Sequence, residues 1–268
     1  MFHPISQPVF SERQLSGALR QLRGLLGDLL AVTSPAVCPG QLNVDACAFS
    51  KSFHRLVRLV HNLEYLQEAA SSDGSPFSPV TMDLDGLCRQ TAELAGDLLA
   101  QAQITLDYDH GTIRGLLMPG DPKLLQRMIL GLISNAALSA GTDRILLALQ
   151  RHRDRAVLTL SHNGPAPSDR QLAQLLQQDL TESIPLPGQG AGLGLAVIRH
   201  IVSLHGGTMF PVLGDSAPTM VISLPTGPLD PRTTVSTPPL QRDGGLDSLM
   251  VELADVLPAR LFGLEGLD

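Results

Sequence analysis

The first 71 residues carry apolar side chains at helical spacing. One predicted helix spans 11–34, where leucines recur at steps of three and four residues: Leu15, Leu19, Leu22, Leu26 and Leu29. A second helix repeats this spacing with Phe49, Phe53, Leu56, Val60, Leu63 and Leu66. Prolines and a glycine within 35–40 separate the two, which predicts an antiparallel hairpin over 11–71. Because a lone helical pair buries little apolar surface, we expect two copies to form a dimeric four-helix bundle. Packing against the rest of its own chain is the alternative.

The rest of the chain mixes helical and strand patterns. A linker rich in Ser, Gly and Pro spans 72–79. We expect helices at 83–100, 121–140, 168–178 and 192–205, and strands at 104–108, 112–117, 144–150, 155–161, 208–212 and 219–224. This order predicts an α+β protein, with a two-layer α/β sandwich over 80–226.

The two ends of the chain have a different composition. Residues 1–10 form an N-terminal arm, and 227–268 form a tail rich in Pro, Thr, Asp and Gly, which we expect to be flexible. The tail ends in a short amphipathic segment from Leu246 to Phe262. That segment is either a capping element of the sandwich or a partner-binding motif.

Charge and cysteine content restrict the partners and the compartment. A net charge of −7 argues against binding nucleic acid or an anionic membrane surface. No apolar stretch approaches the roughly 20 residues that a membrane span needs, and the first ten residues do not resemble a secretory signal. The three cysteines have no zinc-binding spacing. We therefore expect a cytoplasmic protein.

A glycine-rich loop carries the strongest chemical signal. Glycines occupy every second position in Gly188-Gln189-Gly190-Ala191-Gly192-Leu193-Gly194-Leu195, and the loop leads directly into a predicted helix. Backbone N–H groups that no Cβ shields, together with the positive end of the helix dipole, suit a phosphate group. The alternative for such a loop is a flexible connection with close helix packing.

Two polar positions accompany this loop. Asn135 interrupts an apolar helix, where its amide needs polar partners and its carbonyl oxygen suits Mg²⁺. The second, His162-Asn163-Gly164-Pro165, follows a strand and predicts a turn that frames a flat ligand.

In order and spacing, these motifs resemble the ATP-binding domain of sensor histidine kinases, a fold of the Bergerat type shared with DNA gyrase and the MutL proteins. The resemblance covers about 79–225, and the hairpin stands where the family has its dimerisation and phosphoacceptor helices. It implies ATP and Mg²⁺ as cofactors, with Asn135 on the metal and with His162 and Gly164 in the adenine box. The phosphates would lie against Gly188, Gly190, Gly192, Leu193, Gly194 and Leu195. A response regulator or another sensor kinase is the implied partner.

The sequence departs from the family where the chemistry is done. The family's aspartate, which accepts a hydrogen bond from the adenine amino group, is replaced by His162, whose neutral imidazole has one acceptor nitrogen. A glycine of the same box is Ala166, and Gly131 and Leu138 replace a polar and a basic residue around Asn135. The family's Ser-His-Glu-Leu-Arg phosphoacceptor motif reads Ser16-Gly17-Ala18-Leu19-Arg20, without its histidine and glutamate.

Three functions follow from these features. The leading interpretation is a histidine-kinase-like ATP-binding protein of two-component signal transduction that is catalytically degenerate and acts as a pseudokinase or scaffold. The second is an active kinase that phosphorylates a partner protein in trans. The third is a phosphotransfer protein with a vestigial ATP site, in which His54 or His61 accepts the phosphoryl group. For both histidines, an ordinary surface or interface role is the simpler interpretation.

Overall fold

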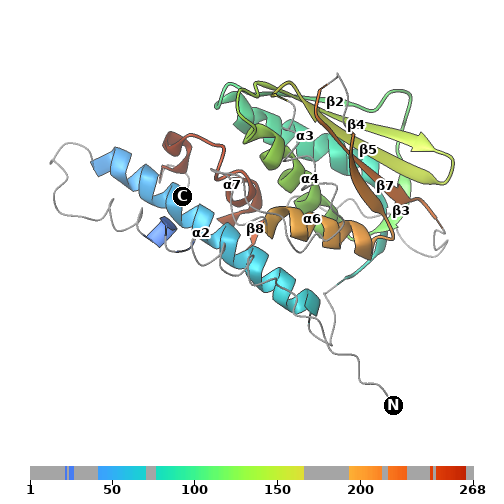
Figure 1. Cartoon of the computed structure of the whole chain (residues 1–268), viewed down its shortest axis with the longest axis horizontal. Helices are drawn as coiled ribbons and strands as arrows, with labels where there is room; N and C mark the ends of the chain where they lie inside the picture. The colour runs from blue at the N-terminus through green and yellow to red at the C-terminus, as the bar shows by residue number, and fades with distance from the viewer. Residues whose placement is uncertain are drawn as a thin grey trace, which may run out of the picture.

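A computed structural model describes residues 22, 24–26, 42–70, 77–165, 193–212, 217–227, 242–243 and 246–263. It consists of an α/β sandwich with one long helix, α2 (Leu42–Ala70), beside it (Figure 1). The helix predicted over 11–34 lies outside the described residues except for residues 22 and 24–26, which are helical. The helix predicted over 168–178 also lies outside them.

The main sheet has five strands. Its order is β2 (Thr105–Asp109), β4 (Arg144–His152), β5 (Arg155–His162), β7 (Thr219–Pro225) and β6 (Thr208–Val212). The pair β2 and β4 is parallel, and every other neighbouring pair is antiparallel. Alternate residues of β4 point into the core, as period-two patterning requires: Ile145, Leu147 and Leu149.

A separate two-stranded sheet corrects one prediction. Strand β1 (Val80–Asp83) pairs antiparallel with β3 (Leu117–Gly120), so the strand expected over 112–117 was wrong and begins only at its last residue. Residues 111–116 turn instead, because Gly111 and Gly115 have positive φ. Two carboxylates hold this turn: Asp83 accepts from the backbone N–H of Leu116 at 2.8 Å, and Asp85 accepts from that of Gly115 at 3.2 Å.

Three helices cover one face of the main sheet (Figure 1): α3 (Leu84–Ala100), α4 (Pro122–Ala137) and α6 (Leu193–Leu204). The predicted start of α4 is confirmed, because Asp121 caps the helix through the N–H groups of Lys123 and Leu124 and Pro122 occupies the first turn. The helix ends at Ala137, three residues before the predicted end. Eleven of its sixteen residues are buried, which makes α4 the centre of the core.

The C-terminal segment docks on the sandwich. It begins with a small hairpin of β8 (Arg242–Asp243) and β9 (Leu246–Asp247) and continues into α7 (Ser248–Glu252) and a 3₁₀ turn, η2 (Ala259–Phe262). Its contacts with α4 and α2 match the alternative of a capping element.

Helix α2 packs against its own chain along one face. It contacts α6, α7 and η2, and Leu59, Tyr65 and Leu66 are buried there. Apolar residues remain exposed elsewhere on the helix, with exposed fractions of 41% for Phe49, 43% for Phe53 and 38% for Val60. None of the helices within the described ranges has the length and apolar character needed to span a bilayer.

Candidate functional site

The candidate nucleotide site is organised around the C-terminal half of α4. Asn135 is half-buried on this helix, and within the described part of the chain nothing is hydrogen-bonded to its amide. One turn earlier, a Cβ on Gly131 would lie 3.1 Å from Ile198 Cδ1, so α6 packs closely at that position. The amide of Asn135 is therefore available to a ligand beside the α4–α6 contact.

His162 ends β5 and is bound to the loop that follows α4. Thr142 Oγ1 lies 3.1 Å from His162 Nδ1, and the backbone N–H of Gly164 donates to the same nitrogen at 3.2 Å. The adjacent Asn163 fixes this loop further, because its amide oxygen accepts from the N–H groups of Asp143 and Arg144 and its NH₂ donates to Asp143 Oδ1. Hydrogen bonds therefore fasten the turn at 162–164 to the residues at the start of β4.

These contacts define the protonation of His162. A backbone N–H only donates, so His162 Nδ1 must be the unprotonated acceptor, and Nε2 carries the proton. Burial lowers the pKa of His162 below its ordinary 6.5, which keeps the ring neutral at pH 7. The one acceptor nitrogen of the neutral ring is thus already used within the turn, and the other ring nitrogen is a donor.

The other predicted nucleotide contacts fall into two groups. Leu193 is buried at the start of α6, and Gly194 and Leu195 follow it in the first turn, where an added Cβ on Gly194 would meet nothing within 4 Å. Gly188, Gly190 and Gly192 lie outside the described residues, as does Ala166. A helix N-terminus at Leu193 is nevertheless the kind of place where a phosphate binds.

Two replaced family positions have structural roles. Gly131 is buried where α4 and α6 meet, and Leu138 is the C-cap of α4, with its N–H bonded to the carbonyls of Ser134 and Ala136. Neither side chain can contribute charge or a hydrogen bond to a phosphate.

The candidate phosphoacceptor His54 is half-buried on α2. Its Nδ1 donates to the Ser50 carbonyl oxygen at 2.7 Å, and its ring packs edge-on against Phe262, with centroids 5.0 Å apart. No carboxylate in the described ranges is hydrogen-bonded to this ring. His54 therefore lacks the acidic neighbour that would take up its proton during phosphoryl transfer.

The described ranges hold no cluster of three or more potential metal ligands. The amide oxygen of Asn135 fits a supporting role for an Mg²⁺ ion that a nucleotide brings with it, because Mg²⁺ usually binds through few protein ligands and substrate phosphates. The neutral ring of His162 has no second acceptor nitrogen to offer an adenine amino group, because its acceptor Nδ1 is bonded within the turn.

Sequence reasoning missed Thr142 and the charged contacts of the C-terminal segment. Thr142 lies in a short turn with no distinctive pattern. For the charged contacts a signal was present: Glu252 and Asp255 stand three residues apart, as do Arg55 and Arg58 on α2. Matching spacing of opposite charges on two amphipathic segments favours pairing between them.

Comparison with known proteins identifies the class. The Histidine kinase-, DNA gyrase B-, and HSP90-like ATPase family matches residues 120–236. The sensor protein ChvG of Agrobacterium fabrum is 26% identical over 168 residues, 58% of this chain and 27% of ChvG. The circadian input-output histidine kinase CikA of Synechococcus elongatus is 30% identical over 169 residues, 60% of this chain and 22% of CikA. The chain therefore spans about a quarter of the length of these relatives.

Solved structures show the same fold. Histidine kinase AdeS of Acinetobacter baumannii superposes with a TM-score of 0.59 at 18% identity, over 80% of this chain and 98% of AdeS. Histidine kinase ThkA, solved in complex with response regulator protein TrrA, superposes with a TM-score of 0.58 at 14% identity, over 80% of this chain and 60% of ThkA. Fold and matched motifs define a histidine kinase-like ATPase domain of two-component systems. The chain belongs to the sensor histidine kinase family.

The close packing around Gly164 leads to a test of the turn. A Cβ at Gly164 would lie 2.5 Å from Thr142 Oγ1 and 2.9 Å from His162 Nδ1. We expect Gly164→Ala to lower the free energy of unfolding by about 1–3 kcal/mol. The matched control Gly194→Ala meets no neighbour and should raise it by up to about 1 kcal/mol, because alanine favours helix. Urea unfolding of both variants measures this, and equal effects would contradict the packing of the turn.

Proposed function

We propose that this protein is a degenerate member of its family, a pseudokinase or scaffold of two-component signal transduction. The observation that carries the proposal is the occupied acceptor of His162. The family resemblance assigns this position to adenine, and with Nδ1 used by the turn the ring has only an N–H donor left for an amino group that is itself a donor. A site with this polarity binds adenine weakly.

The replaced positions around Asn135 support the same conclusion. Gly131 and Leu138 serve packing and helix capping, so two side chains that would interact with a phosphate are gone. Among the described residues nothing is hydrogen-bonded to the amide of Asn135, which supports residual Mg²⁺-dependent nucleotide binding.

The acceptor side of the reaction is also impaired. Gly17 and Ala18 replace the histidine and glutamate of the phosphoacceptor motif. His54, the remaining candidate, is packed against Phe262 and has no acid partner among the described residues. Both halves of an autophosphorylation reaction therefore lack essential groups.

The second candidate function, phosphorylation of a partner in trans, is favoured by Asn135. A kinase that supplies no acceptor of its own still needs a metal ligand and a phosphate-binding loop, and Asn135 and the glycine-rich loop 188–195 are the candidates for these two roles. ATP affinity and turnover separate this function from a scaffold.

We also propose that the chain forms a homodimer through α2 and the preceding helical segment. The support is the apolar stripe of α2, in which Phe49, Phe53, Leu56, Val60 and Leu63 are spaced by alternating steps of four and three residues. This is the repeat of a helix-pairing seam, in which Phe49, Phe53 and Val60 are exposed while Leu56 and Leu63 also pack against the core of their own chain.

A response regulator or another sensor kinase is the partner that we propose, acting in the cytoplasm. The neighbour ThkA is a kinase-fold protein solved with a response regulator, which supports this kind of partner. The cysteine content suits a reducing compartment.

A substitution at residue 162 should restore the hydrogen bond that the family makes to the adenine amino group. In His162→Asp, one carboxylate oxygen can accept from Gly164 N–H while the other stays free for the adenine amino group. We expect Mg·ATP affinity to rise about 10- to 150-fold, the range for a hydrogen bond to a charged acceptor. Isothermal titration calorimetry measures it, with the exposed His152→Asp as the control for charge. Unchanged affinity would show that the acceptor of His162 does not limit binding.

The purified protein should not phosphorylate itself on histidine. Incubation with radiolabelled ATP and Mg²⁺ should give no acid-labile label, because the phosphoacceptor motif has lost its histidine and glutamate and no carboxylate of the described residues is hydrogen-bonded to His54. An active histidine kinase serves as the positive control. Acid-labile label that disappears in His54→Gln would overturn the proposal and make this an active enzyme with a relocated acceptor.

Light scattering tests the dimer. The wild-type chain should have twice the 28.5 kDa monomer mass, and Phe53→Asp should reduce it to one monomer because a charge enters the apolar seam. Phe210→Asp is the matched control, since this phenylalanine is equally exposed but lies on β6. A monomeric wild type, or the same loss in both variants, would contradict pairing through α2.

A further inference from the structure

The C-terminal segment, residues 246–263, fits into the space between α2 and α4. Its apolar side chains are buried there: Leu249, Val251, Leu253, Ala254, Leu257 and Phe262. Apolar burial of this extent gives the segment a stable docked position but does not by itself select one orientation. Charged groups supply that selection.

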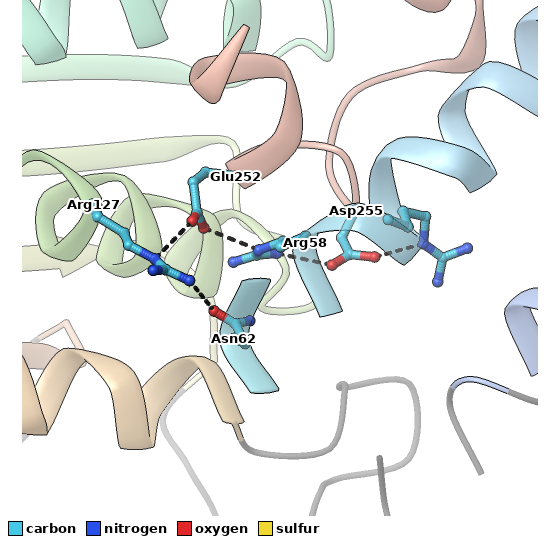
Figure 2. Close-up of polar contacts among 6 residues, drawn as sticks. Arg58, Asn62, Arg127, Glu252 and Asp255 are labelled. Atoms are coloured by element: carbon cyan, nitrogen blue, oxygen red, sulfur yellow. Dashed lines mark hydrogen bonds and ion pairs between the residues drawn. The ribbon is translucent and has the colours of Figure 1, made fainter. Parts of the chain in front are cut away.

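A buried ionic network joins the segment to α2 (Figure 2). Arg58 Nε binds Glu252 Oε2 at 3.1 Å, and Arg58 Nη1 binds Asp255 Oδ2 at 2.8 Å. Arg55 Nε binds the other oxygen of Asp255 at 2.6 Å. The side chains of Arg58 and Glu252 are only 9% and 11% exposed, so neither has water to replace a lost partner.

The same network continues into the ATPase domain. Arg127 of α4 contacts Glu252 Oε1 at 3.3 Å and donates to Asn62 Oδ1 at 2.9 Å (Figure 2). Its guanidinium also lies over the ring of Tyr65, whose hydroxyl is 3.0 Å from His200 Nδ1 on α6. Glu252 thus holds one arginine of α2 and one of α4, and a shift between the two helices breaks at least one of these contacts.

Two further contacts fasten the far end of the segment. Arg260 Nη2 donates to the carbonyl oxygen of Gln101 at the end of α3, at 2.6 Å. Phe262 packs against His54, and Gly263 lies beside Cys47 of α2. The segment is therefore attached to α2 and to the sandwich along its whole length.

We propose that residues 246–263 are an intramolecular brace that locks α2 in one position on the ATPase domain. A shift of α2, α4 or the segment would separate these ion pairs and leave buried charges unpaired. Such a shift therefore costs free energy, and the network favours the docked arrangement. While the brace is docked, α2 and α4 move as one body, and His54 stays covered by Phe262. When the brace undocks, α2 can move relative to α4 and Phe262 no longer covers His54. The proposal does not depend on nucleotide binding.

Hydrogen exchange of the full-length protein tests the lock. In Arg58→Gln, we expect amide exchange to accelerate about tenfold or more both in 52–66 and in 249–262, because the two segments open together, and not in the strand residues 145–149. The matched control Arg144→Gln removes the exposed ion pair with Asp107 and should change neither segment. Acceleration in only one of the two segments, or equal effects in both variants, would overturn the brace.

A disulfide provides a second test that does not depend on weakening the fold. Gly263 has φ −66°, which any residue adopts, and a Cβ there would lie 3.6 Å from Cys47 Sγ, close enough for a disulfide after a small shift. In Gly263→Cys with Cys38→Ser, oxidation should link Cys47 to the introduced thiol within one chain, because Cys88 is buried. Added to Arg58→Gln, this link should return exchange in 52–66 and 249–262 toward the wild-type rate.

Peptide mapping under non-reducing conditions identifies which cysteines are linked. Gly263→Ser is the control, because serine has no thiol and cannot form the disulfide. A link that forms only between two chains would show that the segment docks on a second copy. Failure to form any link would place the segment elsewhere. Either result overturns the intramolecular brace.

Discussion

The burial of α4 is the constraint on which the rest of the structure depends. A helix that is apolar on most of its surface must be covered on most of its sides. The sheet covers one side, α3 and α6 cover others, and α7 closes the remainder. Two of its polar residues that are not fully buried, Arg127 and Asn135, carry the link to the C-terminal segment and the candidate metal contact. The buried positions of α4 therefore serve packing, whereas these two partly exposed positions are available for polar contacts.

The same packing explains why residue 131 is a glycine and not the polar residue that the family resemblance leads one to expect. Gly131 permits α6 to approach so closely that a Cβ would lie 3.1 Å from Ile198 Cδ1. A polar side chain at this position would need space that Ile198 fills, so the close approach of α6 and a phosphate-binding residue at 131 exclude one another. Leu138 is the C-cap at the end of the helix, where its backbone N–H binds the carbonyls of Ser134 and Ala136. At both positions the residue present serves the packing or the end of α4.

Sequence periodicity predicted the sandwich well because its elements are locally encoded. The helices α3, α4 and α6 and the strands β2, β4, β5, β6 and β7 lie within a few residues of their predicted bounds. The prediction failed at 112–117, where alternating side chains indicated a strand but Gly115 turns the chain and Asp85 binds its backbone. Strand β1 was missed because its partner, β3, lies more than thirty residues away. Non-local pairing of this kind leaves no local periodicity.

For the candidate site, residue types and spacing suggested positions, whereas the polarity of His162 depends on contacts that the sequence does not show. Asn135, His162 and Gly164 could be chosen from residue type and spacing, whereas the proton on His162 is set by Thr142 and by the N–H of Gly164. An aspartate has two oxygens, so it can hold the turn with one and a ligand with the other. An imidazole has a single acceptor, and here the turn takes it. Histidine can therefore hold this turn as an acceptor, but it keeps no second acceptor as an aspartate would.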